Sequence, residues 1–280
     1  AAARLVVAAG EGESNEWLAA GEALDLGLGW SSSAAWSSIA PLPRLRAGFA
    51  SAAIGSRLYL LGGTDEDDVE LSSVEVYDAA VDMWVRGTPP MLVARTGAAA
   101  VGVGGRIYVA GGNGGDDMGY LDCVERLDVG SCRWEPLTPM VGARADAAAA
   151  ALPGGVCVAG GRDSRAVLAT AERLDLALGF WEPLPDLAVP RAHCAAVCWD
   201  GSLIVAGGFD CATYLDVVER LAPSAARWEA LRPLSVPRAG ACAVALCGEV
   251  YVLGGQAAGR TTSGAERLDL GAGEGAPSSP

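Results

Sequence analysis

Short apolar runs alternate with polar segments along the chain, and the same order of segments returns about every 48 residues. One copy is Arg106–Trp134, in which an apolar run ends in a Gly-Gly pair, a polar loop follows, and an alternating segment leads to a tryptophan. Within that copy, Val124–Asp128 alternates as a half-buried strand does. The pattern therefore predicts short β-strands grouped into repeated units.

Four markers keep the units in register. The Gly-Gly pairs are Gly62-Gly63, Gly111-Gly112, Gly160-Gly161, Gly207-Gly208 and Gly254-Gly255, at steps of 49, 49, 47 and 47 residues, with a weaker first copy at Ala9-Gly10. An arginine stands sixteen residues before each pair, at Arg46, Arg95, Arg144, Arg191 and Arg238. Glutamates follow at Glu22, Glu75, Glu125, Glu172, Glu219 and Glu266, and tryptophans at Trp36, Trp84, Trp134, Trp181 and Trp228. Markers that keep register over the whole length indicate a repeat protein.

The sequence of each complete unit predicts four strands. In one unit these are Gly97–Gly102, Ile107–Ala110 after a tight Gly-Gly turn, Val124–Asp128, and a last strand that begins at the tryptophan. Four strands per unit and six marked units predict an all-β fold, a six-bladed β-propeller in a single domain over residues 1–270. A solenoid of hairpins is the competing architecture, but it needs polar capping repeats, and neither end of the sequence has one.

The first and last units are predicted to be incomplete. The first has no arginine-led inner strand before Leu5, and the last reads GAGEGAPSSP where its tryptophan strand should stand. We therefore expect about 22 of the 24 strands of a complete ring, and a disordered tail at residues 271–280.

The repeat resembles the kelch family. The glycine doublet after an apolar strand is one hallmark, and a tyrosine and a tryptophan separated by six residues, here Tyr77 and Trp84, are the other. In later units Leu127, Leu174 and Leu221 stand in the tyrosine's place. The resemblance covers residues 4–270 and implies a kelch-type propeller similar to those of BTB-kelch and F-box-kelch proteins. It says less about function, because such propellers include both binding modules and enzymes.

Charge and hydropathy narrow the class of protein. The formal net charge of -14 disfavours nucleic acid and anionic membrane surfaces as partners. The longest nearly apolar stretch, Ala147–Gly161, is too short to span a bilayer. The first ten residues lack the features of a signal peptide. We therefore expect a cytoplasmic protein.

The spacing of the cysteines does not indicate a disulfide framework. They are Cys123, Cys132, Cys157, Cys194, Cys198, Cys211, Cys242 and Cys247, and they occupy no fixed place in the repeat. A disulfide scaffold would show regular spacing, so we expect reduced thiols of an intracellular protein. No pair has CxxC spacing and His193 is the only histidine, so we expect no metal and no cofactor.

The residues that mark the repeat are expected to be structural. A catalytic residue is needed once, whereas these recur at equivalent positions. The glycines should permit a sharp turn and close approach of the neighbouring blade. Tryptophan should fill the wedge between blades while its N–H bonds to backbone. Glutamate and arginine should form buried pairs, between adjacent blades or to tie the loops.

Topology indicates where function lies. The loops after each Gly-Gly pair and the segments before each arginine should share one face, and varied loops on a rigid scaffold often bind partners. These loops are residues 11–17, 64–70, 113–120, 162–165, 209–214 and 256–260. The early loops are acidic and the later ones carry arginines. The acidic residues are Glu11, Glu13, Glu16, Asp65, Glu66, Asp67, Asp68, Glu70, Asp116 and Asp117.

A groove for a peptide whose basic residues lie toward the acidic loops is the sharper hypothesis, with aromatic side chains as anchors. A solvated acidic rim is the alternative. The candidate partner-binding residues are Glu11, Trp17, Asp65, Glu66, Asp68, Asn113, Asp116, Asp117, Tyr120, Arg162, Arg165, Phe209, Tyr214 and Arg260.

The sequence carries no recognisable catalytic signature. One histidine excludes the copper site of galactose-oxidase-type propellers, and the sequence has neither a Ser-His-Asp set nor a GxxxxGKS phosphate loop. The leading hypothesis is a protein-interaction module that is no enzyme. By resemblance it would be the substrate-recruiting part of a ubiquitin-ligase adaptor that reaches a cullin-based ligase through flanking domains.

Two alternatives stay open: an actin-associated scaffold, and a small-molecule enzyme such as a sugar epimerase or a metal-dependent lyase. A deep axial pocket with convergent carboxylates and arginines would favour the enzyme. A shallow, wide bowl would favour a module that binds a peptide.

Overall fold

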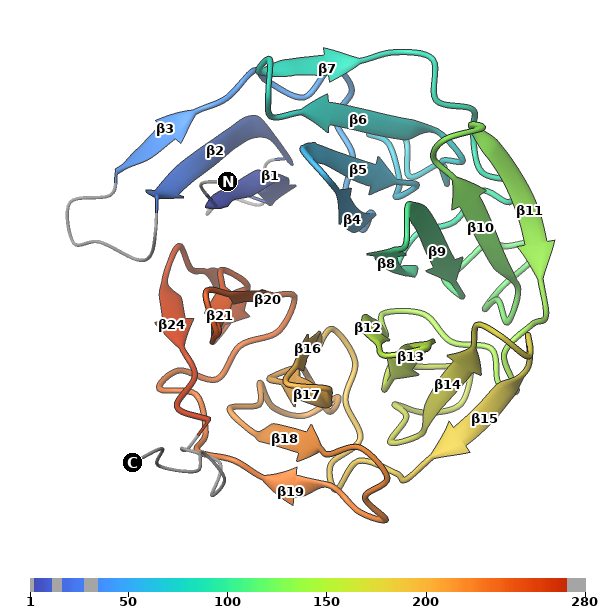
Figure 1. The fold of residues 1–280 in the computed structure, drawn as a ribbon, viewed down its shortest axis with the longest axis vertical. Coiled ribbons are helices and arrows are strands. Elements are labelled where there is room, and N and C mark those ends of the chain that lie inside the picture. The colour runs from blue at the N-terminus through green and yellow to red at the C-terminus, as the bar shows by residue number, and fades with distance from the viewer. Residues whose placement is uncertain (1–2, 12–16, 28–34, 271–280) are drawn as a thin grey trace, which may run out of the picture.

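The computed structural model describes residues 3–11, 17–27 and 35–270, and all the secondary-structure elements within them are β-strands. The described strands form seven sheets, six of which are arranged as blades around a central axis (Figure 1). Four of these sheets have four antiparallel strands each. The predicted six-bladed propeller with four-stranded blades is thereby confirmed. No helix in the described part of the chain could cross a membrane.

The blades follow one another along the chain. Blade 1 has β1 (Ala3–Glu11), β2 (Trp17–Gly27) and β3 (Trp36–Ser38), and blade 2 has β4 (Ala50–Ile54), β5 (Arg57–Leu61), β6 (Val74–Asp78) and β7 (Met83–Val85). Blade 3 has β8 (Ala99–Val103), β9 (Arg106–Ala110), β10 (Val124–Asp128) and β11 (Arg133–Leu137). Blade 4 has β12 (Ala148–Leu152), β13 (Gly155–Ala159), β14 (Ala171–Asp175) and β15 (Trp181–Leu184). Blade 5 has β16 (Ala195–Trp199), β17 (Ser202–Ala206), β18 (Val218–Leu221) and β19 (Glu229–Ala230), and blade 6 has β20 (Cys242–Leu246), β21 (Glu249–Leu253) and β24 (Ala265–Arg267).

Each complete blade runs outward from the axis, with its first strand innermost and its fourth at the rim (Figure 1). The second strands are the most buried elements, and all five residues of β13 and of β17 are buried. The core lies between blades, where side chains of adjacent sheets interdigitate. Ala52 and Val76 of blade 2, for example, belong to one cluster with Ile107 and Val109 of blade 3. Small side chains on the inner strands allow the sheets to converge at the axis.

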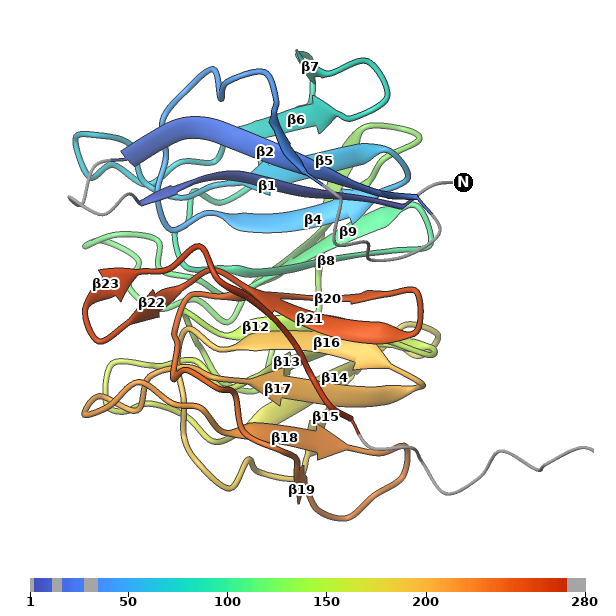
Figure 2. The ribbon, with the colours of Figure 1, turned by 90° about the vertical axis from the view of Figure 1, so that its left-hand side faces the viewer.

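The end blades have three strands each within the described residues, as expected. Among these residues, blade 1 has no strand equivalent to the first strand of a complete blade, and blade 6 has none equivalent to the fourth. An additional hairpin, β22 (Gln256–Ala257) and β23 (Arg260–Thr261), projects from blade 6 after its Gly-Gly pair (Figure 2). The tail expected at residues 271–280 lies outside the described residues.

The two end blades meet through side chains. Leu5 and Leu24 of blade 1 form a buried cluster with Tyr251 and Leu253 of blade 6. Blade 1 lies next to blade 6 in the ring (Figure 1). Apolar packing thus closes the propeller.

A series of backbone hydrogen bonds also joins consecutive blades near the axis. Two residues after each repeated arginine stand Gly48, Gly97, Asp146, His193 and Gly240, all with positive φ. The N–H of each of the last four donates to the carbonyl of the residue before it in this series, at 2.7 Å in every case. Because each bond joins one blade to the next, the series holds blades 2 to 6 together near the axis.

Candidate functional site

The loops that follow the glycine doublets lie at the same edge of the blades as the residues next to the repeated arginines. Isolated bridges join the residue after each arginine to the residue after the doublet of the same blade, as in Ala47–Thr64 and Thr96–Asn113. The same pairing recurs in the remaining blades, at Ala145–Arg162, Ala192–Phe209 and Ala239–Gln256. The prediction that these two sets of segments share one face is confirmed, and we call it the loop face.

The glycine doublets hold the neighbouring blade close to this face. The backbone at Gly62 has φ +65, and a Cβ there would lie 2.3 Å from the carbonyl oxygen of Arg95 in the next blade. The following N–H, at Gly63, donates to that same carbonyl at 2.9 Å. The expectation that these glycines permit a turn and a close approach is confirmed. Any side chain at this position would separate the two blades.

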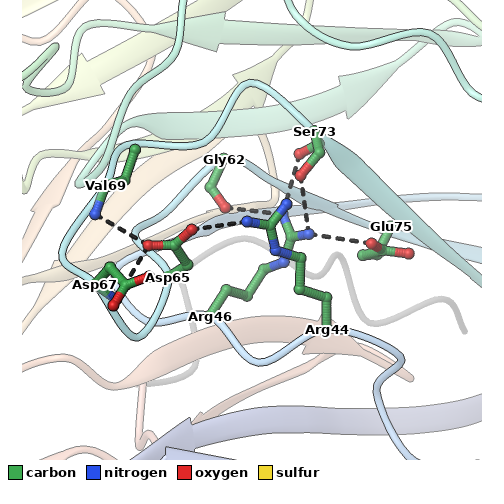
Figure 3. A network of polar contacts seen from close by, with 8 residues as sticks. All are labelled: Arg44, Arg46, Gly62, Asp65, Asp67, Val69, Ser73 and Glu75. Atoms are coloured by element: carbon green, nitrogen blue, oxygen red, sulfur yellow. Dashed lines mark hydrogen bonds and ion pairs between the residues drawn. The ribbon is translucent and has the colours of Figure 1, made fainter.

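The repeated arginines are buried and donate to groups of their own blade. Nη1 of Arg46 donates to the carbonyls of Gly62 and Ser73 at 2.9 and 3.0 Å, and Nη2 reaches Glu75 at 3.2 Å (Figure 3). The five pairs Arg46–Glu75, Arg95–Glu125, Arg144–Glu172, Arg191–Glu219 and Arg238–Glu266 measure 3.2, 2.7, 2.6, 2.8 and 3.8 Å. The expected pairing between adjacent blades is wrong, because the arginine precedes the first strand and extends across its own sheet to the third.

The glutamates do tie the loops. The second carboxylate oxygen of Glu125 accepts the N–H of Leu92 at 2.6 Å, and Glu219 accepts that of Ala188 at 2.9 Å. Both N–H groups belong to the segment that enters the blade on the loop face. A buried ion pair thus anchors each of these segments, and the loop face rests on a rigid support.

The tryptophans of the outer strands also behave as predicted. Nε1 of Trp84 donates to the carbonyl of Ala40 at 2.8 Å, and Nε1 of Trp134 to that of Pro89 at 3.0 Å. Trp181 and Trp228 make the equivalent bonds to Thr138 and Pro185. Each indole therefore fills the space beside the segment that joins two blades and satisfies its own donor there.

One candidate acid, Asp65, shapes its own loop. Oδ1 of Asp65 accepts the N–H groups of Asp67 and Val69, and its other oxygen pairs with Arg44 at 2.7 Å (Figure 3). The N–H of Val69 is the main reason that the pKa of Asp65 lies below its ordinary value. Asp163 and Asp210, two residues after their doublets, accept two backbone N–H groups each in the same way. Neither aspartate was among the candidate residues, although an aspartate followed by a short polar turn is a known turn signal.

Other acids on the loop face remain exposed. Glu66 and Asp68 of blade 2 and Asp116 and Asp117 of blade 3 are exposed, and their side chains make no ion pair with the described residues. Glu70 lies at the boundary between these loops, since a Cβ on Gly115 would come within 2.7 Å of its carboxylate. The acidic loops of two adjacent blades thus form one negative surface, which we call the acidic patch.

A half-open groove of about 550 Å³ lies beside this patch, between blades 3 and 4. Its walls are Gly119 and Tyr120 of the blade 3 loop, residues 142–144 of the segment entering blade 4, and Asp163, Ser164 and Arg165 of the blade 4 loop. The groove brings two of the predicted site residues together, Tyr120 and Arg165.

The remaining candidates lie elsewhere on this face. Asn113 accepts the N–H of Gly115 within its own loop. Phe209 and Tyr214 of blade 5 contact each other, with ring centres 5.4 Å apart, and Arg260 lies in β23 of blade 6. The backbone of Glu11 lies opposite that of Trp17 in the register of β1 and β2, whereas Glu13 and Glu16 lie outside the described residues.

Asp146, Arg162 and His193 meet near the axis. Nε of Arg162 donates to Oδ2 of Asp146 at 2.6 Å, and Nε2 of His193 is 3.6 Å from the same oxygen. Asp146 was not singled out from the sequence. Its positive φ and its place in the backbone series near the axis make it a residue that joins blades.

The eight cysteines are free. Burial raises the pKa of Cys157 to about 12 and that of Cys194 to about 11, so both thiols are neutral and pack as small apolar groups. Among the described residues, no group of three or more His, Cys, Asp or Glu side chains is arranged to hold a metal ion.

The chain matches two kelch family models and is similar in structure to a solved protein. Residues 48–255 match the KLHDC2/KLHL20/DRC7 Kelch-repeats domain, and residues 237–274 match the Kelch motif. No curated protein sequence matches the chain. A solved structure titled "Structure of YjhT" superposes with a TM-score of 0.79 at 18% identity, over 94% of this chain and 91% of that chain. At that identity the likeness concerns the fold alone.

Proposed function

Because the chain belongs to the kelch-repeat family, we propose that its propeller is a protein-interaction module that binds a peptide or protein partner on the loop face. Kelch propellers commonly serve such a role, and here one observation carries the proposal. The exposed acids Glu66, Asp68, Asp116 and Asp117 of the acidic patch make no ion pair with the described residues. The ends of their two loops are held by hydrogen bonds from the buried Arg46 and Arg95. A rigid negative surface next to a groove suits a partner with basic residues.

The form of the groove supports binding over chemistry. It lies between the loops of two adjacent blades and is open to solvent. Asp163 is the one carboxylate among its lining residues, and its Oδ1 already accepts two backbone N–H groups. An enzyme of the epimerase or lyase type would need convergent acids and bases that reach a bound substrate. We therefore keep the small-molecule enzyme as the alternative that the loop face favours less.

A role as the substrate-recruiting domain of a ubiquitin-ligase adaptor is a finer proposal, and it rests on analogy with other kelch proteins. It would require a ligase-binding domain outside these 280 residues. An actin-associated scaffold is the near alternative within the binding class. We place either role inside the cell, where the irregularly spaced thiols would stay reduced.

Affinity capture with matched charge variants tests the loop face. One variant carries Asp116→Asn with Asp117→Asn, and a second carries Glu66→Gln with Asp68→Asn. The control carries Asp200→Asn with Glu249→Gln, at tight turns on the opposite face. We expect each loop-face variant to capture a specific partner about fivefold less well, because each removes two attractive charges.

The control variant should capture the partner as the wild type does, and all melting temperatures should agree. Capture should also weaken as salt is added, because exposed charges are screened. Equal capture by all variants would overturn the proposal and move the binding site to another surface. Capture of no specific partner by the wild type would count for the enzyme alternative.

A further inference from the structure

Blade 1 has an open place where the complete blades have their first strand. In the register of β1 and β2, Val7 lies opposite Glu22, as Leu60 of the second strand lies opposite Glu75 of the third in blade 2. β1 is therefore a second strand, and no described strand pairs with its inner edge. Blade 1 lies between blades 6 and 2 in the ring (Figure 1). We call the place beside β1, between β20 of blade 6 and β4 of blade 2, the open slot.

The glycine doublet of blade 6 lacks a contact that the doublets of blades 2 to 5 make. In those blades the N–H of the second glycine donates to the carbonyl of the repeated arginine in the next blade, at 2.8–2.9 Å. A Cβ on the first glycine would lie 2.2–2.4 Å from that oxygen. In blade 6 the N–H of Gly255 has no acceptor among the described residues, and a Cβ on Gly254 would lie 3.6 Å from the nearest described atom. The place of an arginine carbonyl is thus empty next to blade 6.

The backbone series near the axis is open at both ends. It begins with the bond from Gly97 to Gly48 and ends with the bond from Gly240 to His193. Within the described part of the chain, the N–H of Gly48 has no acceptor and the carbonyl of Gly240 has no donor. One residue in the open slot would accept the N–H of Gly48 and donate to the carbonyl of Gly240. The series would then close into a ring with one residue from each blade.

Glu22 lacks the arginine partner that the other repeated glutamates have. It is exposed and makes no ion pair with the described residues. The others each pair with the arginine that leads into their own blade, and they are Glu75, Glu125, Glu172, Glu219 and Glu266. Glu22 occupies the same register position as Glu75. An arginine that leads into the open slot would therefore reach Glu22, as Arg46 reaches Glu75.

The walls of the open slot carry small side chains. On the side of blade 6, Cys242 is exposed, whereas the first residues of β4, β8, β12 and β16 are buried alanines. On the side of blade 2, Ser51 and Ala53 are exposed, whereas Ala50 and Ala52 pack toward blade 3 and are buried. The exposed residues are those that face the slot. A first strand with small side chains would cover both walls.

The ring is closed without a strand in this slot. The cluster of Leu5, Leu24, Tyr251 and Leu253 already joins blades 1 and 6. The occupant of the slot can therefore be a ligand that comes and goes. An unpaired strand edge is the usual template for the addition of an extended peptide, which brings main-chain hydrogen bonds and alternating side chains.

We propose that the open slot binds an extended segment of a partner protein, which joins blade 1 as its first strand. The segment carries an arginine that pairs with Glu22, and the carbonyl of that arginine accepts the N–H of Gly255. Two positions later it has a residue that takes a positive φ, such as glycine, and a run of small apolar residues follows. This site goes beyond the proposed function, because it uses neither the acidic patch nor the groove between blades 3 and 4.

A peptide that copies a first strand of this chain tests the site. Acetyl-Val-Ala-Arg-Thr-Gly-Ala-Ala-Ala-Val-Gly-Val-amide has the sequence of residues 93–103, which lead into and form β8. Fluorescence anisotropy of the dye-labelled peptide with the 280-residue chain measures its dissociation constant. Glutamine in place of the peptide's arginine should weaken binding about tenfold, because a charged hydrogen-bond donor is lost. Two successive prolines in its strand should abolish binding, because at least one N–H of the ladder is lost.

Variants of the chain locate the peptide in the open slot. Glu22→Gln should weaken binding of the arginine peptide about tenfold and leave the glutamine peptide unaffected. Gly254→Ala should abolish binding, because its methyl group would occupy the place of the arginine carbonyl. Gly248→Ala is the matched control and should bind as the wild type does. Gly248 also has a positive φ, but it lies in a tight turn where an added Cβ has no atom within 4 Å.

A fused segment separates a partner's strand from a strand of the same chain. The eleven peptide residues are joined through Gly-Gly to Arg4, which occupies the register position of Arg106 at the start of β9. The fused chain should melt at a higher temperature than the wild type and should not bind the free peptide, because its slot is filled.

The proposal is overturned if the three peptides bind equally, if none binds, or if Glu22→Gln and Gly254→Ala bind the arginine peptide as Gly248→Ala does. Stabilisation of the fused chain without binding of the free peptide would also overturn it, because the slot would then take a segment of the same chain. None of these results bears on the acidic patch, whose charge variants leave the open slot intact.

Discussion

Arg191 and Glu219 are ionised side chains that are almost completely removed from water, with 0% and 2% of their side chains exposed. Burial lowers the pKa of Arg191, and the charge of Glu219 opposes that shift. The guanidinium also donates to the carbonyls of Gly207, Val217 and Val189, and the glutamate accepts the N–H of Ala188. A buried pair is tolerated only with such full hydrogen bonding. The equivalent pair of blade 2 is looser, since Glu75 is 21% exposed and 3.2 Å from Arg46.

This difference predicts unequal costs for the same substitution. Glu219→Gln should lower the free energy of unfolding by about 3 kcal/mol, because it leaves the charge of Arg191 buried and unpaired. Glu75→Gln should cost about 1 kcal/mol or less, because water reaches that carboxylate. Urea denaturation of both variants at pH 7 measures the two values. Equal losses of unfolding free energy would show that the burial of an ion pair does not determine the cost of removing its carboxylate charge.

At the scale of elements, the turn out of each second strand decides how closely adjacent blades approach. Gly62 and Gly55 both have positive φ, at +65 and +61. Only Gly62 faces the next blade, where the carbonyl of Arg95 occupies the place of a Cβ. A Cβ added to Gly55 would have no atom within 4 Å. Two glycines with the same backbone conformation thus have different surroundings.

Alanine at the two positions separates backbone strain from blade contact. Gly55→Ala should cost about 1 kcal/mol, the strain of a non-glycine residue in the left-handed region. Gly62→Ala should cost about 3 kcal/mol or more, because strain adds to a clash that moves the next blade. Thermal and urea unfolding provide both numbers. A Gly62→Ala variant as stable as Gly55→Ala would contradict the close approach described here.

At the scale of the whole molecule, different contacts join different pairs of adjacent blades. Blades 2 to 6 are joined near the axis by the backbone series from Gly48 to Gly240, whereas blades 1 and 6 meet through the cluster around Leu24 and Leu253. The inner edge of β1 and the outer edge of β24 have no neighbouring strand among the described residues. Strands at such edges open more readily than central ones.

Hydrogen exchange should therefore follow position in the ring. We expect amides of β1 to exchange well before those of β13, and amides of β24 before those of β14, although each pair occupies equivalent places in its blade. Exchange measured by mass spectrometry after peptic digestion resolves these strands. Similar protection in β1 and β13 would mean that blade 1 is held as firmly as the complete blades.

Much of the fold could be predicted from the sequence. The glycine doublets, arginines and tryptophans recur at fixed offsets, so they predicted the blade number, the strand order and the shared loop face. They also predicted the roles of glycine and tryptophan. The partner of each arginine was predicted less well, because an offset along the chain does not tell whether Glu75 or a glutamate of the next blade lies within reach of Arg46.

The candidate site could be predicted only in outline. The uneven charge of the loops pointed to the acidic patch, and the face on which it lies followed from topology. The sequence did not show that Asp65, a candidate binding residue, also accepts two backbone N–H groups of its own loop.

The sequence by itself thus determined the repeat, the number of blades and the positions that need glycine, because these depend on backbone preferences over a few residues and on a period that any unit reveals. The tertiary structure alone decided which carboxylates remain free, where the groove opens and how blades 1 and 6 meet. The groove and the contact of the end blades depend on residues about half a unit or more apart in the chain, and the distances between them exist only once the sheets have packed around the axis.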